Sequence, residues 1–177
     1  MDRFSACLAV LFFNEGGVSN HPADKGGLTN LGVTQVTYDS YRHAKGLPLQ
    51  PVTMCTTGEA TELYHMLYWT PAKCDTWMEP VDLCVFDTAV NSGPKRSLMI
   101  LQQALGFTGT QVDGLIGNQT LNAVKLVQPL VLAQRYCDAR ERFFYDICAA
   151  NPSQKVFLSG WVNRIDHIRD VAGIPKS

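Results

Sequence analysis

Residues 15–34 read EGGVSNHPADKGGLTNLGVT, a polar and glycine-rich stretch that directly follows an apolar segment. Upstream of it, four apolar residues recur at the spacing of one helix face: Phe4, Leu8, Leu11 and Phe12. Gly16-Gly17 favours the end of that helix, and Glu15 extends its apolar face at the last turn. The rest of the stretch is typical of turns, with short strands expected near Val18 and Leu31–Val33.

The remainder of the chain has the hydrophobic period of helices. Six further helices are expected, near residues 57–69, 80–91, 98–105, 121–127, 129–147 and 161–172. The tetrapeptide Asn91-Ser92-Gly93-Pro94 predicts a sharp end to the second of these, and Pro129 suits the first turn of the fifth. The sequence therefore predicts a mainly α fold with two lobes, of which one is small and irregular or β-containing, near residues 14–36.

The chain has 177 residues, 46% of them hydrophobic and 18% charged, which excludes extended disorder and favours one compact unit. The net charge of −1 conceals an asymmetry. Residues 1–94 hold five Lys/Arg against ten Asp/Glu, net −5, and residues 95–177 hold ten against six, net +4. Either the basic half handles a polyanion, or the charges only solvate the surface.

Several classes of protein lack support in this sequence. The apolar run Ala6–Phe13 is too short for a membrane span and has no small-residue cleavage site, so we expect neither a span nor a signal peptide. We expect synthesis in the cytoplasm, with an external route to any target outside it. No basic run with interleaved aromatics indicates nucleic-acid binding. The six cysteines have no C-x-x-C spacing, which argues against zinc, and we expect them to be reduced and mostly buried.

Glu15 has the position expected of a general acid. Hydrolysis of a glycosidic bond needs a protonated acid at the leaving oxygen and, in most families, a second carboxylate that activates water or attacks. A carboxylate on an apolar helix face loses hydration, which raises its pKa towards neutrality. Asp24 could face Glu15 across a cleft, and Thr29 could hold a water molecule. Taken singly, each has a structural alternative: a solvated helix end, a turn former and a structural threonine.

Residues 15–34 closely resemble the opening motif of the glycoside hydrolase family 108 lysozymes, which occur in bacteriophage endolysins and bacterial cell-wall hydrolases. The resemblance continues in three later motifs, FDTAVNSG at 86–93, LQQALG at 101–106 and VDGLIGNQTL at 112–121. The later motifs look like the family's C-terminal region, which is described as a predicted peptidoglycan-binding module, although Asp113-Gly114 also reads as a tight turn packed on a core. The resemblance implies a lysozyme-like fold with a catalytic region at 1–94 and a helical C-terminal region at 95–177, which we expect to form one integrated domain.

The resemblance also implies roles for single residues. Glu15 matches the catalytic glutamate of the family. The order of Glu15, Asp24 and Thr29 is similar to the Glu-Asp-Thr triad of small bacteriophage lysozymes, which implies that Asp24 and Thr29 position the attacking water. A slightly different loop alignment makes Thr34 the rival for the threonine role. The expected substrate contacts are His21, Asn30 and Asn91.

The resulting hypothesis is an endolysin-type lysozyme that hydrolyses the β-1,4 bond between N-acetylmuramic acid and N-acetylglucosamine in peptidoglycan. It is expected to need no cofactor or metal, to bind peptidoglycan glycan strands as a monomer, and to act on the cell wall in the periplasm after release or delivery. Two alternatives stay open at this point: a secreted antibacterial muramidase effector and a chitinase-like glycosidase.

Overall fold

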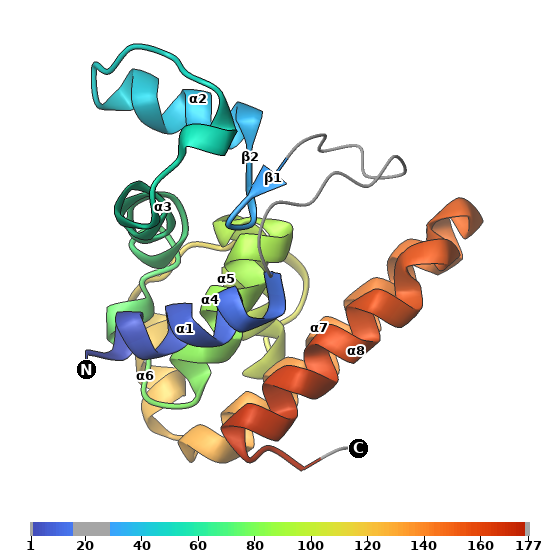
Figure 1. The fold of residues 1–177 in the computed structure, drawn as a ribbon. Helices are drawn as coiled ribbons and strands as arrows, with labels where there is room; N and C mark the ends of the chain where they lie inside the picture. Colours follow the sequence, from blue (N-terminus) through green and yellow to red (C-terminus); the bar gives the residue numbers. More distant parts are fainter. Residues whose placement is uncertain (1, 16–28, 176–177) are drawn as a thin grey trace. The chain divides into compact units, whose positions relative to one another are not determined.

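The computed structural model describes the backbone of residues 2–15 and 29–175, and their side chains except those of residues 13–15. The described part is mainly helical with one small antiparallel sheet, which confirms the predicted fold class (Figure 1). The chain divides into two compact units, Met1–Thr70 (unit 1) and Pro71–Ser177 (unit 2), which are described in turn. The predicted division at residues 94 and 95, and the integration of the two regions, stay predictions.

Unit 1 begins with the amphipathic helix α1 (Arg3–Glu15), as the apolar spacing predicted. Leu8 and Leu11 on its apolar face are buried. The Phe4 ring packs edge-on against the ring of Trp69, with centroids 5.3 Å apart, and the Phe12 ring does the same against Tyr64 at 5.5 Å. Both ends of the described face of α1 therefore pack on aromatic side chains of the helical segment 57–69.

A two-residue hairpin follows, made of β1 (Thr29–Asn30) and β2 (Val33–Thr34). Leu31 and Gly32 form its turn with φ of 53° and 73°, as tight two-residue hairpins require. Of the strand expected near Leu31–Val33, Val33 does lie in a strand, β2, whereas Leu31 lies in the turn. The expected strand near Val18 lies outside the described residues.

Three helical segments complete unit 1. They are α2 (Gln35–Ala44), α3 (Thr57–Tyr64) with its π-helical extension η2 (His65–Trp69), and the short 3₁₀ turn η1 (Val52–Met54). Helix α2 was not predicted from the sequence. Glu59 connects this helix to α3, because its carboxylate accepts from the Tyr38 hydroxyl at 3.0 Å and forms an ion pair with Arg42 at 2.6 Å. Glu59 also closes the capping box of α3 with Thr56.

Unit 2 is built around α4 (Val81–Ser92), in which residues 81–89 are all buried. The 3₁₀ turn η3 (Cys74–Thr76) precedes it, and the elements packed against α4 include α5 (Pro94–Ala104), α7 (Pro129–Ala150) and α8 (Lys155–Ala172). The remaining elements are η4 (Gly109–Gln111), α6 (Asn118–Lys125) and η5 (Pro152–Gln154). In Figure 1, α7 and α8 run side by side as a long helical hairpin. All six helices predicted after residue 56 are present.

A buried ion cluster joins three helices of unit 2. The Asp87 side chain on α4 is fully buried, and its carboxylate lies 2.6 Å from the Arg140 guanidinium on α7 and 2.9 Å from that of Arg164 on α8. Desolvation is the largest effect on the pKa of Asp87 and raises it, but the two guanidinium groups together outweigh it, so the net pKa is lowered. Asp87 therefore stays ionised and fixes the packing of α4, α7 and α8.

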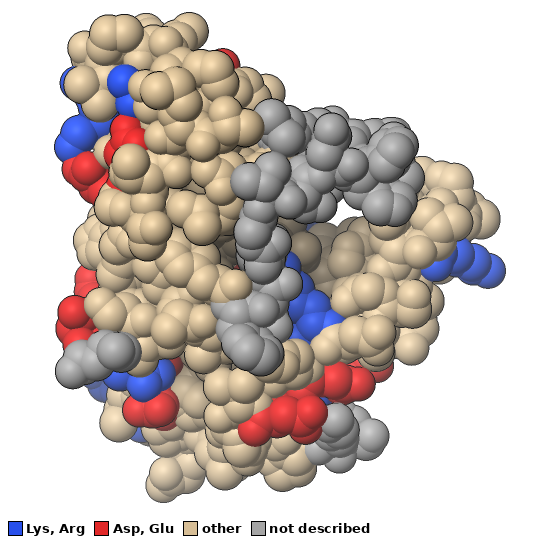
Figure 2. Space-filling model, viewed as in Figure 1, with Lys and Arg blue, Asp and Glu red and all other residues tan. Residues whose placement is uncertain are grey.

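The structure also describes the cysteines and the distribution of charged side chains. All six cysteines are buried and unbonded, as expected. On the face drawn in Figure 2, Lys and Arg side chains lie beside Asp and Glu at several places, and most of the described surface is uncharged. None of the described helices combines the length and the apolar character that crossing a membrane requires.

Candidate active site

Glu15 is the last residue of α1, at the position where Gly16-Gly17 was predicted to end the helix. The two preceding turns are anchored by Leu8 and Leu11, which are 4% and 0% exposed. The backbone at Glu15 therefore belongs to a helix that packs firmly against the rest of unit 1. The Glu15 side chain, and the predicted site residues His21 and Asp24, lie outside the described residues.

Tyr64 connects the end of α1 to the hairpin. Its ring contacts Phe12 in the last full turn of α1, and its hydroxyl donates to the Leu31 carbonyl in the hairpin turn at 3.2 Å. Tyr64 itself is 1% exposed. One buried side chain thus holds both the helix that carries Glu15 and the strand that carries Thr29. This role of Tyr64 was not predicted from the sequence, because its hydrogen-bonded partner lies 33 residues away and leaves no signal in the local pattern.

The two candidate threonines lie directly opposite each other in the hairpin, because Thr29 pairs with Thr34 in the antiparallel register. Side chains at such positions project from the same face of a sheet with Cβ atoms about 5 Å apart. Thr34 also caps α2, since its Oγ1 accepts from the Thr37 backbone N–H at 3.2 Å and lies 2.9 Å from the Thr37 hydroxyl. The Thr34 oxygen is therefore committed to the start of a helix.

Asn30 anchors the hairpin on its other side. Its side-chain NH₂ lies within 3.1–3.4 Å of three backbone carbonyls, those of Val52, Thr53 and Cys55. These bonds hold β1 against η1, so a substrate contact by Asn30 would have to use its side-chain oxygen. Its predicted role as a substrate contact stays a prediction.

Asn91, the third predicted substrate contact, lies in unit 2. It is exposed on the last turn of α4, and its side-chain oxygen accepts from the Ser92 hydroxyl at 3.0 Å. The described structure therefore gathers Thr29, Thr34 and Asn30 in one hairpin beside the end of α1, and it describes Asn91 in a separate unit.

Among the acidic groups that the structure describes in unit 1, Glu59 and Glu62 are unsuited to donating a proton near neutrality. The pKa of Glu59 is lowered, mainly by the bond from the Thr56 backbone N–H. The pKa of Glu62 is lowered, mainly by its bond from Lys45. Both carboxylates are held ionised in structural contacts, Glu62 also accepting from the Tyr41 hydroxyl at 2.7 Å. A general acid needs the opposite shift.

Comparison with known families extends this picture. A family model described as Glycosyl hydrolase 108 matches residues 8–93, which include the second half of α1, the hairpin and α4. A second model, described as Predicted Peptidoglycan domain, matches residues 96–166. The solved structure titled "Structure of Brucella abortus SagA" is 30% identical in sequence with a TM-score of 0.80, over 98% of this chain and 96% of that one. The chain belongs to glycosyl hydrolase family 108.

As a family 108 protein, the chain is a glycoside hydrolase that acts on peptidoglycan, which confirms the resemblance noted in the sequence. The first model covers the elements that carry Glu15 and Thr29, and the second covers α5 to α7 and most of α8. A search of curated proteins returned no significant match.

Proposed function

We propose that the enzyme is an N-acetylmuramidase that hydrolyses the β-1,4 bond between N-acetylmuramic acid and N-acetylglucosamine, with Glu15 as the general acid. Asp24 and Thr29 position the attacking water. The observation that carries this assignment is the link made by Tyr64, which contacts both the last turn of α1 and the hairpin turn. An acid and a water-holding hydroxyl must be fixed relative to each other, and this buried link supplies that constraint.

We assign the water-holding role to Thr29 and not to Thr34. Thr29 has the place of the threonine in the Glu-Asp-Thr order that the sequence resembles, and Thr34, opposite it in the hairpin, serves as the N-cap of α2. Removing an N-cap threonine costs about 0.5–2 kcal/mol of stability. Thr34→Ala is therefore expected to lower the melting temperature with a small effect on turnover, and Thr29→Ala to lower turnover with a small effect on melting.

We further propose that the reaction inverts the anomeric centre. A retaining route needs a carboxylate about 5 Å from the acid that attacks the sugar, whereas an inverting route leaves roughly 6.5–9.5 Å for a water molecule. A threonine hydroxyl that acts together with a second carboxylate is suited to holding water and contributes nothing to direct attack. Thr29 on a fixed hairpin therefore favours the single-displacement route.

The deciding experiment compares Glu15→Gln with the wild-type enzyme on purified sacculi. The amide is nearly isosteric but cannot donate the proton, so turnover should fall at least about a hundredfold. Asp24→Asn should lose most of its activity as well. Digests reduced with borohydride should carry reduced N-acetylmuramic acid at the new ends, and early NMR spectra should contain the inverted anomer.

Other results would redirect the assignment. A Glu15→Gln enzyme with more than about a tenth of wild-type turnover would remove Glu15 as the acid. Reduced N-acetylglucosamine ends would indicate a glucosaminidase. Efficient cleavage of chitin, compared with sacculi at equal sugar concentration, would favour the chitinase-like alternative.

We also propose that the enzyme is made in the cytoplasm and reaches the wall as an endolysin. Expression in a Gram-negative host should then cause lysis only when the inner membrane is opened, for instance by a co-expressed holin. A neighbouring gene whose product binds and inhibits the enzyme would instead favour the secreted-effector alternative.

A further inference from the structure

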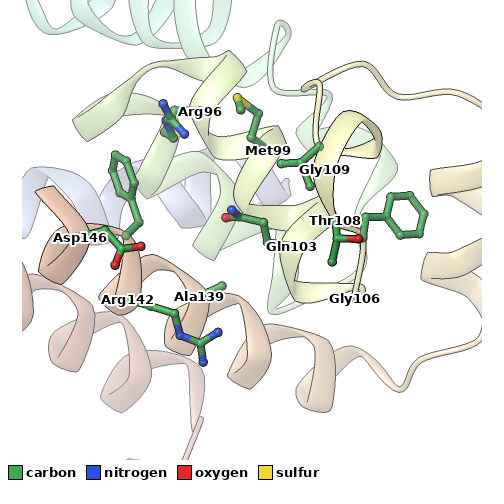
Figure 3. A pocket seen from close by; sticks show the side chains of 12 residues that line it. Arg96, Met99, Gln103, Gly106, Thr108, Gly109, Ala139, Arg142 and Asp146 are labelled. Atoms are coloured by element: carbon green, nitrogen blue, oxygen red, sulfur yellow. The ribbon is translucent and has the colours of Figure 1, made fainter. Parts of the chain in front are cut away.

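A cavity of about 650 Å³ lies within unit 2 (Figure 3). One wall is α5, which contributes Arg96, Met99 and Gln103, and the facing wall is α7. The loop at residues 106–112 closes one end. All of these residues fall within the region that matches the Predicted Peptidoglycan domain.

The α7 wall results from the helical period. Ala139, Arg142 and Asp146 are spaced by three and four residues, so they share one face of the helix and line the cavity. The opposite face carries Arg140 and Phe144, which are buried in the core of unit 2. One face of the long helix α7 therefore packs against the core, and the other face lines the cavity.

Three charged groups line the cavity, Arg96, Arg142 and Asp146. Within the residues that the structure describes, no ion pair involves Arg96, Arg142 or Asp146. The Arg96 guanidinium instead lies over the Phe143 ring, 4.7 Å from its centroid, which fixes it at the cavity wall. The arginines of the core behave differently. Arg140, Arg164 and Arg169 each contact at least one carboxylate.

The chemistry of the cavity suits a small zwitterionic peptide. A guanidinium group binds a carboxylate with two parallel hydrogen bonds, so the two arginines could hold two carboxylates. The Asp146 carboxylate could accept from an ammonium group. Aliphatic and aromatic parts of the lining, from Met99, Phe107 and Val112, could cover short apolar side chains.

Peptidoglycan contains one component with this combination of groups. Its sugar rings are mostly neutral, whereas its stem peptides carry several carboxylates, small alanine side chains and a diamino acid. We propose that this cavity binds the stem peptide of peptidoglycan, with Arg96 and Arg142 on carboxylates and Asp146 on the ammonium group of the diamino acid. The proposal rests on the proposed function, in that peptidoglycan is the polymer on which the enzyme acts.

The proposal separates two kinds of recognition. The candidate active site in unit 1 binds the glycan strand, and the cavity in unit 2 binds the stem peptide. Binding to intact sacculi should therefore exceed binding to glycan strands from which an amidase has removed the stem peptides. This preference should depend on the cavity and weaken as salt rises, because it is carried by charged groups.

The test measures this preference in full-length Glu15→Gln protein, which should bind without turnover. Sedimentation with intact sacculi and with amidase-stripped strands gives the ratio of the two affinities. Arg142→Ala should reduce that ratio about tenfold, the usual effect of losing a hydrogen-bonded charge. Arg135→Ala is the matched control, because Arg135 is exposed on the same helix but is not part of the cavity lining, and it should keep the parent ratio.

A second measurement identifies the peptide group. Calorimetry with a free stem tetrapeptide that contains diaminopimelate should give tighter binding than with the lysine-containing equivalent, which lacks one carboxylate. Asp146→Asn should weaken binding of both peptides, since both carry the ammonium group. Melting curves identify any variant that is misfolded. If Arg142→Ala is misfolded, Arg142→Lys replaces it, because lysine keeps the positive charge but not the forked guanidinium group.

Two outcomes would overturn the proposal: an unchanged ratio in both Arg142→Ala and Arg142→Lys, or no detectable binding of either peptide to the parent protein. These outcomes are distinct from a failure of the proposed function. That failure would appear as turnover by Glu15→Gln or as the wrong reducing end in the digest, neither of which depends on the cavity.

Discussion

Asp87→Asn should be among the most destabilising single substitutions in unit 2. The Asp87 side chain is fully buried, and it is the carboxylate that the Arg140 and Arg164 guanidinium groups share. Asparagine has the same shape but no charge, so two cationic side chains, 2% and 19% exposed, would be left facing a neutral amide. Removing one partner of a buried ion pair typically costs about 3–5 kcal/mol.

This cost converts to a large shift in melting temperature. For a chain of about 150–250 residues each kcal/mol lowers the melting temperature by about 2–4 °C, so Asp87→Asn should melt roughly 6–20 °C below the wild-type protein. The matched control is Asp138→Asn. Arg169 also pairs with Glu141 and Asp166, and the Asp138 side chain is 36% exposed, so the loss of Asp138 should cost less than about 1 kcal/mol.

The pH dependence gives a second, independent readout. Because the pKa of Asp87 is lowered on folding, its contribution is complete above the unfolded-state pKa of about 3.9 and is lost as the pH falls through the lower folded-state value. The gap in melting temperature between the wild-type protein and Asp87→Asn should therefore be constant from neutrality to about pH 4 and shrink below it. Calorimetry on both variants would refute the reasoning if Asp87→Asn melted within about 2 °C of Asp138→Asn at pH 7.

Three further predictions use contacts elsewhere in the chain. Gly114→Ala should lower the free energy of unfolding, measured in urea, by about 1–3 kcal/mol. Gly114 has a φ of +75°, and an added Cβ would lie 2.9 Å from the Lys95 carbonyl oxygen. Gly160→Ala, which lies in open space within α8, should raise the free energy of unfolding by about 0.5–1 kcal/mol. Tyr64→Phe keeps the ring contact with Phe12 but loses the hydrogen bond to the Leu31 carbonyl, which should cost about 1 kcal/mol of stability. The rate of sacculus cleavage should fall by more than the small loss of folded protein explains. A thiol reagent such as Ellman's should modify none of the six buried cysteines in the native protein and all six after denaturation, and rapid labelling of the native state would contradict their burial.

The helices were predictable wherever aliphatic residues mark the buried face. The spacing of Leu98 and Leu101, both buried, located α5, and the same logic located α1 and α7. Helix α2 was missed because its buried face is not aliphatic. It consists of Tyr38, Tyr41 and Arg42, whose polar groups are satisfied by Glu59 and Glu62 on α3. Those partners lie 17 to 21 residues further along the chain, beyond the reach of a local pattern.

The buried cluster around Asp87 illustrates the same limit more strongly. Asp87 belongs to the motif FDTAVNSG, which resembles the family. Nothing in this motif indicates which groups neutralise an aspartate on the buried helix α4. The partners Arg140 and Arg164 follow 53 and 77 residues later. Only the packing of α7 and α8 against α4 brings the three charges together.

The candidate site divides into residues with proposed chemical roles and residues that hold them, and the sequence indicated a holding role for neither Tyr64 nor Asn30. Glu15 and Thr29 could be proposed because their residue types and spacing match a known chemistry. Tyr64 and Asn30 act through backbone carbonyls, and a backbone carbonyl has no residue type to recognise in a sequence. Yet these two side chains fix the hairpin on both sides, so the position of the Thr29 hydroxyl depends on them as much as on Thr29 itself. A substitution that spares all three proposed catalytic residues can therefore still slow the reaction, by moving the strand on which one of them lies.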